Sequence, residues 1–122
     1  MESYSEQLKK RTQTFAVRVI ELFRTLPNTD EARIVGRQLL RSATSVAANY
    51  RASRRARSRA EFIAKLGIVV EEADETVFWI EILGEANIVS KESLKGYGKE
   101  SGELLSIFAA AYNSSRRIKQ AT

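Results

Sequence analysis

The sequence predicts an all-α fold, an antiparallel four-helix bundle with up-down-up-down topology, in a single domain over residues 1–122. Only one Pro and six Gly interrupt the chain, a composition that favours long helices over many short strands. Four stretches carry apolar residues at helical spacing, and short connections join them. The length is sufficient for one hydrophobic core without stabilising crosslinks.

The first helix is predicted over residues 6–26, because apolar or small side chains recur there at alternating spacings of four and three. These positions are Leu8, Thr12, Phe15, Val19, Leu22 and Leu26. Pro27 ends the helix, since its ring disfavours helical backbone in the preceding residue. Asn28 or Thr29 caps a second helix over residues 30–53. The apolar stripe of the second helix is Val35, Leu39, Ala43, Val46 and Tyr50.

A third helix is predicted from Ser58 to about residue 86, because Ser58 and Glu61 have the spacing of a capping box. Its wide apolar stripe is Phe62, Leu66, Val69, Ala73, Val77, Ile80 and Leu83. A second apolar group, Ile68, Trp79 and Ile82, lies about 100–160° away from this stripe around the helix. A helix in a small monomeric bundle needs one apolar face, so the second face predicts contact with another subunit. The predicted subunit interface consists of Ile68, Glu72, Glu75, Trp79 and Ile82.

The fourth helix is predicted from a Ser90 cap to residue 117, after a left-handed turn at Asn87. Its apolar side is Leu94, Tyr97, Leu104, Leu105, Phe108 and Tyr112. Gly96, Gly98 and Gly102 weaken its first half by up to about 1 kcal/mol each relative to Ala. We therefore expect this half to be the weakest helical segment of the chain.

The composition excludes most catalytic chemistry. With no Cys and no His, the chain cannot use disulfides, thiolates, His-ligated metals or a triad with a His base. Neither a nucleophile elbow nor a phosphate-binding loop is present, although a Lys base is formally possible. We expect no catalytic residues, no cofactor and no enzyme activity.

A run of carboxylates leaves a second interpretation open. Glu71, Glu72, Asp74 and Glu75 fall within five positions of the third helix. Helical bundles hold metal pairs with Glu and His ligands, but the chain lacks the usual Glu-x-x-His motif. Salt bridges to arginines of an adjacent helix or subunit are the favoured interpretation, and an all-carboxylate metal site is the minor one.

The net charge of +5 is unevenly distributed. Residues 1–59 hold 13 Lys and Arg against 5 Asp and Glu, whereas residues 60–122 hold 7 against 10. Five arginines fall within nine positions of the connection between the second and third helices: Arg51, Arg54, Arg55, Arg57 and Arg59. We call residues 51–59 the arginine segment.

The arginine segment is the strongest candidate site. Each guanidinium group can pair with a phosphate through two parallel hydrogen bonds. Arg37 and Arg41 extend this surface if their face of the second helix turns the same way. Pairing with the carboxylates of the third helix is an equal alternative, because neutralised arginines are unavailable to phosphate. Sequence-specific base contacts are not predicted, since no recognition helix or aromatic platform is present.

The second and third helices resemble the four-helix-bundle proteins encoded in intervening sequences of bacterial 23S ribosomal RNA genes. The similarity covers residues 26–89, with QLLRSATSVAANY, a basic turn, EFIAKL and a Glu-rich run that ends in aromatic and aliphatic residues. The matching positions are Gln38, Leu39, Arg41, Ser42, Ser45, Ala48, Asn49, Phe62, Leu66 and Glu75. The chain has Ala52 and Ser53 where many members carry an acidic residue, which makes this segment more basic.

The resemblance implies an antiparallel four-helix bundle that assembles into a homopentameric ring. It also implies a shape similar to the accessory subunit of diversity-generating retroelements, which binds nucleic acid and a reverse transcriptase. No catalytic residues are transferred, because none are known for the family. A closed ring would repeat the arginine segment around its axis and raise avidity without new contacts.

We therefore expect a non-enzymatic, ring-forming protein that binds RNA or DNA through phosphate contacts of the arginine segment, with Arg37 and Arg41 secondary. The alternative is an assembly or adaptor protein that binds another protein, such as a reverse transcriptase. In that case the arginines would make subunit contacts. The polar N-terminus and the lack of a long apolar run predict a cytoplasmic protein without a membrane partner.

Overall fold

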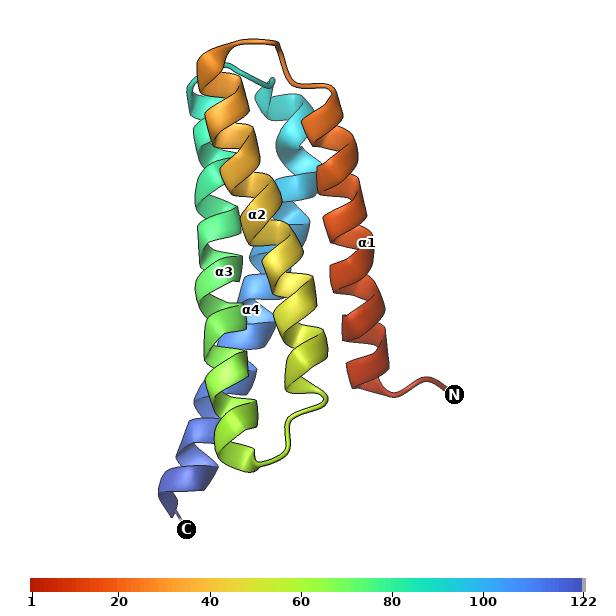
Figure 1. The fold of residues 1–122 in the computed structure, drawn as a ribbon, viewed down its shortest axis with the longest axis vertical. Coiled ribbons are helices and arrows are strands. Elements are labelled where there is room, and N and C mark those ends of the chain that lie inside the picture. Colours follow the sequence, from red (N-terminus) through yellow and green to blue (C-terminus); the bar gives the residue numbers. More distant parts are fainter. Residues whose placement is uncertain (122) are drawn as a thin grey trace.

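The structure, a computed structural model, describes the backbone of residues 1–121 and the side chains of residues 1–117. Within these residues it confirms the all-α four-helix bundle, with consecutive helices antiparallel and side by side (Figure 1). The helices are α1 (Tyr4–Arg24), α2 (Asp30–Ser53), α3 (Arg59–Glu85) and α4 (Lys91–Ala121). None of the described helices combines the length and apolar character needed to cross a bilayer.

Side-chain caps set the starts of the helices. Ser58 Oγ accepts a hydrogen bond from the Glu61 N–H at 3.1 Å, which confirms the predicted start of α3. Ser90 caps α4 in the same way. Thr29, rather than Asn28, caps α2. Helix α1 begins two residues earlier than predicted, because Ser3 Oγ caps it at the Glu6 N–H.

Three helix ends show how local chemistry stops or extends each element. Helix α1 ends at Arg24, two residues before the predicted end, and the Thr25 hydroxyl donates to the Leu22 carbonyl at 2.8 Å. Asn87 adopts the predicted left-handed conformation with φ 58°. Helix α4 continues past residue 117 to Ala121, and its glycine-containing first half is helical.

The core is formed mostly by the predicted apolar stripes, but on α3 Ile63 and Thr76 are buried, whereas the predicted Phe62 and Val77 are half-buried. Phe15, Val19, Leu39, Leu66 and Phe108 are among the side chains buried between the helices. Leu94 and Leu104 of α4 are buried in the same core, which explains why the first half of α4 is helical despite its glycines, since tertiary packing outweighs intrinsic propensity. One polar contact crosses the interior: the buried hydroxyls of Ser42 on α2 and Thr76 on α3 are hydrogen-bonded at 3.0 Å.

Helices α1 and α4 pack less closely than the other neighbouring pairs, and polar groups join them. The Arg11 guanidinium donates to both carboxylate oxygens of Glu100, each at 2.7 Å, and to Glu103 at 2.6 Å. Farther along, Arg18 lies over the Tyr97 ring, 4.8 Å from its centroid. These contacts close the bundle and leave the outer sides of α2 and α3 to carry the candidate site.

Candidate nucleic-acid interface

The arginine segment forms one end of the bundle. Arg51 lies in the last turn of α2, Arg54 caps that helix, and Arg59 is the first residue of α3. Arg55 and Arg57 lie in the connection between the two helices. All five side chains are exposed. In Figure 1 this connection lies at the opposite end of the bundle from the α1–α2 loop.

The arginine segment makes no ion pair with a carboxylate among the described residues. The cations that pair with a carboxylate within residues 1–117 are Lys10, Arg11, Arg33, Arg41 and Lys95. Distance explains the difference: the acidic run begins at Glu71, 12 residues after Arg59 and about 18 Å farther along α3 at 1.5 Å per residue. The acidic run of α3 is therefore too far away to pair with the arginine segment within one subunit, and Glu61, the nearer carboxylate, forms no ion pair with it.

Arg41 has a different environment from the arginine segment. Its Nη1 lies 2.9 Å from Glu72 Oε2, and its Nη2 bonds to Glu75. The Trp79 indole N–H donates to the same Glu75 carboxylate at 3.1 Å. The Arg41 guanidinium, and then the Trp79 N–H, hold the pKa of Glu75 below its ordinary value. The predicted pairing of the acidic run with arginine is thus confirmed for Glu72 and Glu75, inside one subunit.

The carboxylates of the acidic run, Glu71, Glu72, Asp74 and Glu75, do not converge on one point as the ligands of a metal ion would. Within the described part of the chain, no three or more Asp and Glu side chains gather in an arrangement that could hold a metal ion. The sequence places Glu71 and Asp74 on outward positions of α3, where both are exposed. The pairing of Glu72 and Glu75 with one guanidinium satisfies the two more buried carboxylates of the run.

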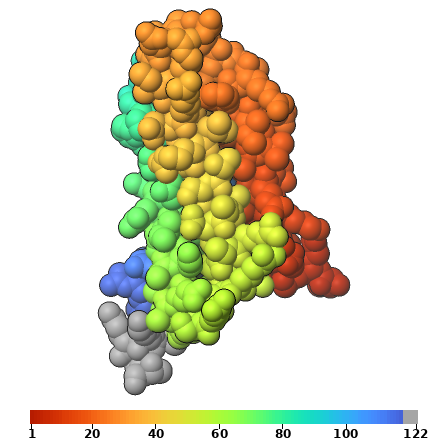
Figure 2. All heavy atoms as spheres, viewed as in Figure 1, coloured from red at the N-terminus to blue at the C-terminus, as the bar shows by residue number. Residues whose placement is uncertain are grey.

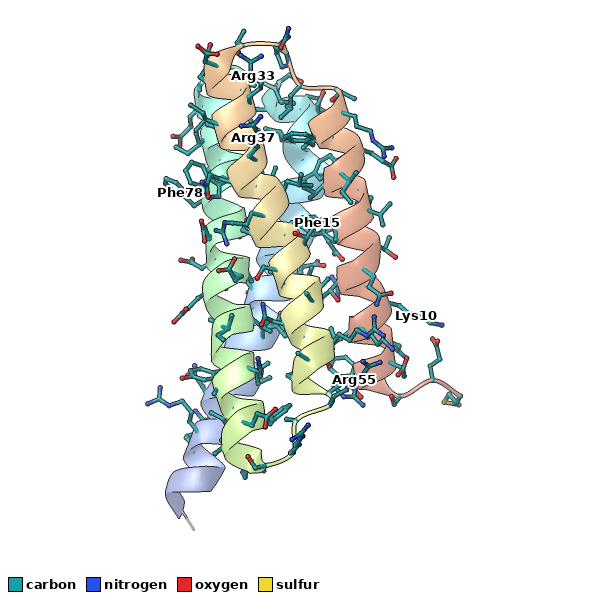
Figure 3. All side chains as sticks on the ribbon, viewed as in Figure 1. Lys10, Phe15, Arg33, Arg37, Arg55 and Phe78 are labelled. Carbon is teal, nitrogen blue, oxygen red and sulfur yellow. The ribbon has the colours of Figure 1, made fainter. Side chains whose placement is uncertain are left out.

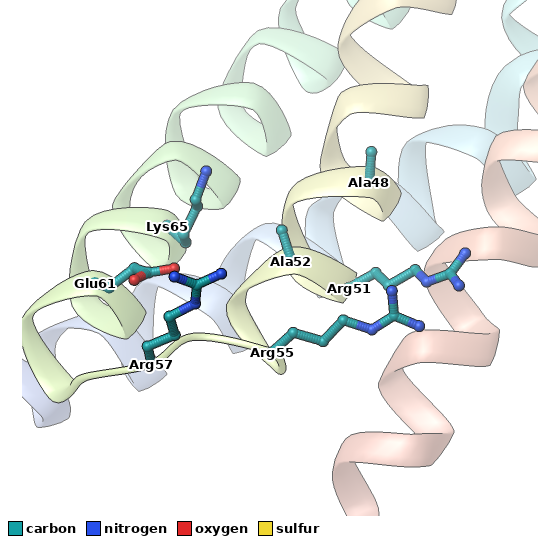
Figure 4. A pocket seen from close by; sticks show the side chains of 7 residues that line it. All are labelled: Ala48, Arg51, Ala52, Arg55, Arg57, Glu61 and Lys65. Atoms are coloured by element: carbon teal, nitrogen blue, oxygen red, sulfur yellow. The ribbon is translucent and has the colours of Figure 1, made fainter.

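A groove lies between the end of α2 and the start of α3, with a volume of about 700 Å³. We call it the basic groove. Its lining residues are Ala48, Arg51, Ala52, Arg55, Arg57, Glu61 and Lys65 (Figure 4). Four of them are cations and one is a carboxylate. Figure 2 shows that the end of α2 and the start of α3 lie next to each other on this face of the molecule.

A late turn of α4 also lies beside the arginine segment. Arg59 Nη2 donates a hydrogen bond to the Ser115 carbonyl of α4 at 3.5 Å. The guanidinium of Arg116 lies 5.4 Å from the Tyr112 ring centroid, and Arg117 is exposed. Arg116 and Arg117 are not among the residues that the sequence predicts for the site. Their position near the arginine segment depends on the packing of α4 and has no local sequence signal.

Arg37 is exposed but stands apart from the basic groove. It precedes Arg51 by 14 residues of α2, which corresponds to about 21 Å along the helix. Figure 3 shows Arg37 toward the α1–α2 loop and Arg55 at the other end of the bundle. The structure therefore brings the five arginines of residues 51–59 together and leaves Arg37 and Arg41 away from them.

The outer side of α3 carries apolar side chains at its surface. Ile68 is 38% exposed, while Trp79 and Ile82 are half-buried. Phe78, which is not among the residues predicted for the subunit interface, is 48% exposed, and its ring meets Trp79 edge-on with centroids 4.8 Å apart. The adjacent Phe-Trp pair was the available signal, because two consecutive aromatics on a helix point 100° apart, which places at least one of them at or beyond the edge of the core-facing side. We call Ile68, Phe78, Trp79 and Ile82 the apolar patch of α3.

Comparison with known proteins agrees with the motifs of the second and third helices. The family model described as "23S rRNA-intervening sequence protein" matches residues 6–110. A crystal structure from Bacteroides thetaiotaomicron, of a protein with unknown function from the S23 ribosomal protein family, is 33% identical in sequence and has a TM-score of 0.82. The similarity covers 89% of this chain and 97% of that one. No curated protein matches the chain. With a family model that spans most of its length, the chain belongs to the 23S rRNA-intervening sequence protein family.

Proposed function

We propose that the protein is a non-enzymatic, ring-forming helical protein that binds RNA or DNA through phosphate contacts of the arginine segment. One observation carries the proposal: five exposed arginines gather at one end of the bundle with no carboxylate partner among the described residues. Like charges held close together repel one another, and a polyanion relieves that repulsion. Arg41 contributes little, because Glu72 and Glu75 already neutralise it.

Self-association is part of the proposal, with a pentamer as the form that the family resemblance implies. The apolar patch of α3 supports it, because Phe78, Trp79 and Ile82 lie within two turns of the helix, and adjoining apolar side chains at a surface mark interaction sites. A closed ring would present several copies of the basic groove to one nucleic acid. Light scattering measures this directly, since a ring has the mass of several copies of the 13.7 kDa chain.

The absence of catalysis is proposed on chemical grounds. The chain has no Cys or His. The basic groove contains arginines, a lysine and one glutamate, and this set suits binding of an anion more than proton transfer at neutral pH, because Arg does not deprotonate.

A titration of the full chain against structured RNA and duplex DNA, at low and moderate salt, tests the proposed function. The test variant changes Arg51, Arg54, Arg55, Arg57 and Arg59 to Ser. The matched control removes five positive charges from the other half of the bundle by changing Arg24, Arg33, Lys91, Lys95 and Lys99 to Ser. We expect the test variant to lose binding and the control to retain most of it. No binding by the wild type at low salt, or equal losses in both variants, would refute the proposal.

The second candidate is an adaptor that binds another protein, such as a reverse transcriptase. The exposed edge-on pair of Phe78 and Trp79 favours it, since aromatic residues are enriched in protein interfaces. A chain that forms a stable oligomer but binds no nucleic acid at low salt would support this candidate. A stable monomer would remove the argument for a ring.

A further inference from the structure

The composition of the basic groove indicates which form of nucleic acid it fits. We infer that the groove binds the phosphodiester backbone of a double helix, of DNA or RNA, rather than the bases of a single strand. This inference rests on the proposed nucleic-acid binding and adds to it the structural class of the ligand.

The cations lie along two sides of the groove. Arg51 and Arg55 come from the α2 side and extend in the same direction, away from Glu61 (Figure 4). Arg57 and Lys65 lie with Glu61 on the α3 side. No carboxylate among the described residues forms an ion pair with any of these four cations. The groove therefore offers two groups of donors, and each group suits a phosphate.

The floor of the groove is small and apolar. Ala48 and Ala52 lie between the two groups of cations, and each side chain is a single methyl group (Figure 4). A rigid, bulky backbone can approach such a floor closely. Neither alanine side chain can donate or accept a hydrogen bond, so the floor offers no hydrogen-bonding partner to a base edge.

Aromatic stacking, the usual device for holding single strands, is missing from the groove lining. The nearby Tyr50 is buried in the core, where its ring lies 5.1 Å from that of Phe108. The Arg116 guanidinium lies over the Tyr112 ring. Tyr4 is exposed but belongs to α1 and does not line the groove. Without an aromatic stacking surface, a flexible single strand gains little binding energy to offset the conformational entropy that it loses on binding. A duplex loses less entropy, because its phosphates are already ordered.

The test compares a duplex of about 20 base pairs with each of its separated strands, in DNA and in RNA, by fluorescence anisotropy with the full chain. We expect the duplex to bind at least about ten times more tightly than either strand at the same salt concentration. The double variant Arg51→Gln, Arg55→Gln should make the slope of log K against log[salt] less negative by about 1.8 for each subunit in contact. Each phosphate contact that is lost accounts for about 0.9 of this change. Arg24→Gln, at the other end of the bundle, should leave the slope unchanged.

Glu61 provides a second, independent variant. Its backbone N–H makes the capping bond to Ser58, so Glu61→Gln leaves the start of α3 intact. A carboxylate near a phosphate is repulsive, and we expect the variant to bind duplex about 1.5 to 5 times more tightly. Weaker binding would show that Glu61 accepts a hydrogen bond from the ligand, which would overturn backbone recognition.

The outcomes separate this inference from the proposed function. If single strands bind as tightly as duplex and the Arg51 and Arg55 changes weaken both, the choice of a double helix is wrong while nucleic-acid binding stands. If neither form binds at low salt, the proposed function itself is wrong. Preferential binding of duplex DNA or duplex RNA supports the inference and identifies which helix the groove fits.

Discussion

Replacement of Arg41 by Met should lower the stability of the bundle without weakening nucleic-acid binding. The side chains of Glu72 and Glu75 are only 17% and 33% exposed, and Arg41 is the cation that separates their charges. The replacement leaves two half-buried carboxylates facing each other without a cation. A hydrogen bond to a charged group contributes about 1.5–3 kcal/mol when buried and less near water. Two such bonds, discounted for exposure, give an expected loss of about 1–3 kcal/mol in the free energy of unfolding.

The pH dependence of this loss follows from Glu75. Its folded-state pKa lies below the ordinary value of 4.5, because Arg41 and then Trp79 donate hydrogen bonds to the carboxylate. Stabilisation by the pair is therefore complete above pH 4.5 and is lost as the pH falls through the folded-state pKa. The difference in free energy of unfolding between wild type and Arg41→Met should therefore be constant above about pH 4.5 and should narrow as the pH falls below it.

Urea unfolding followed by circular dichroism measures both effects, and Arg37→Met is the matched control. Arg37 lies one turn earlier on α2, is exposed and has no ion pair with a described residue. We expect its replacement to change the free energy of unfolding by less than about 0.5 kcal/mol. Equal effects of the two replacements would refute a structural role for Arg41. A loss of nucleic-acid binding in Arg41→Met that matches the loss in an Arg51 variant would contradict its exclusion from the interface.

Four further predictions concern packing and assembly. Gly98→Ala and Gly102→Ala should each raise stability by about 0.5–1 kcal/mol, because an added Cβ meets no atom within 4 Å. Gly36→Ala should lower the melting temperature, since its Cβ would lie 2.5 Å from Leu26 Cδ1 and 3.1 Å from Phe23 Cδ1, so that both side chains would have to move; a gain equal to that of the α4 variants would show that this approach is not tight. Thr76→Val should cost about 1–2 kcal/mol in urea unfolding by removing the buried partner of the Ser42 hydroxyl, and an unchanged midpoint would show that the bond contributes nothing. Phe78→Ser should shift the chain toward monomer in light scattering with its helical circular dichroism intact, and an unchanged mass would exclude Phe78 from the subunit interface.

The fold could be predicted from sequence because each of its determinants is local. Apolar spacing identified the buried stripes, and the Ser58 and Ser90 hydroxyls marked the starts of two helices. The early start of α1 was missed because Ser3 precedes the first apolar position by five residues. The sequence could not decide whether Asn28 or Thr29 caps α2, because both residue types are good N-caps and only the backbone conformation selects Thr29.

The candidate site could be predicted only in part. The arginine segment is continuous in sequence, so its position at the end of a helical hairpin followed directly. Which arginine meets a carboxylate depends on the register between α2 and α3, 31 residues apart for Arg41 and Glu72. Likewise, the approach of Ser115 to Arg59 depends on the length and packing of α4. Such contacts are set by tertiary structure and cannot be predicted from the apolar periodicity of a single helix.

The salt dependence of nucleic-acid binding tests the central claim most directly. The observed affinity of the full chain for a duplex is measured over a series of salt concentrations, for the wild type and for the variant that lacks the five arginines of residues 51–59. If phosphate contacts of the arginine segment hold the ligand, log K falls steeply with log[salt] in the wild type, and most of that slope disappears in the variant. The same steep slope in both proteins would contradict the account.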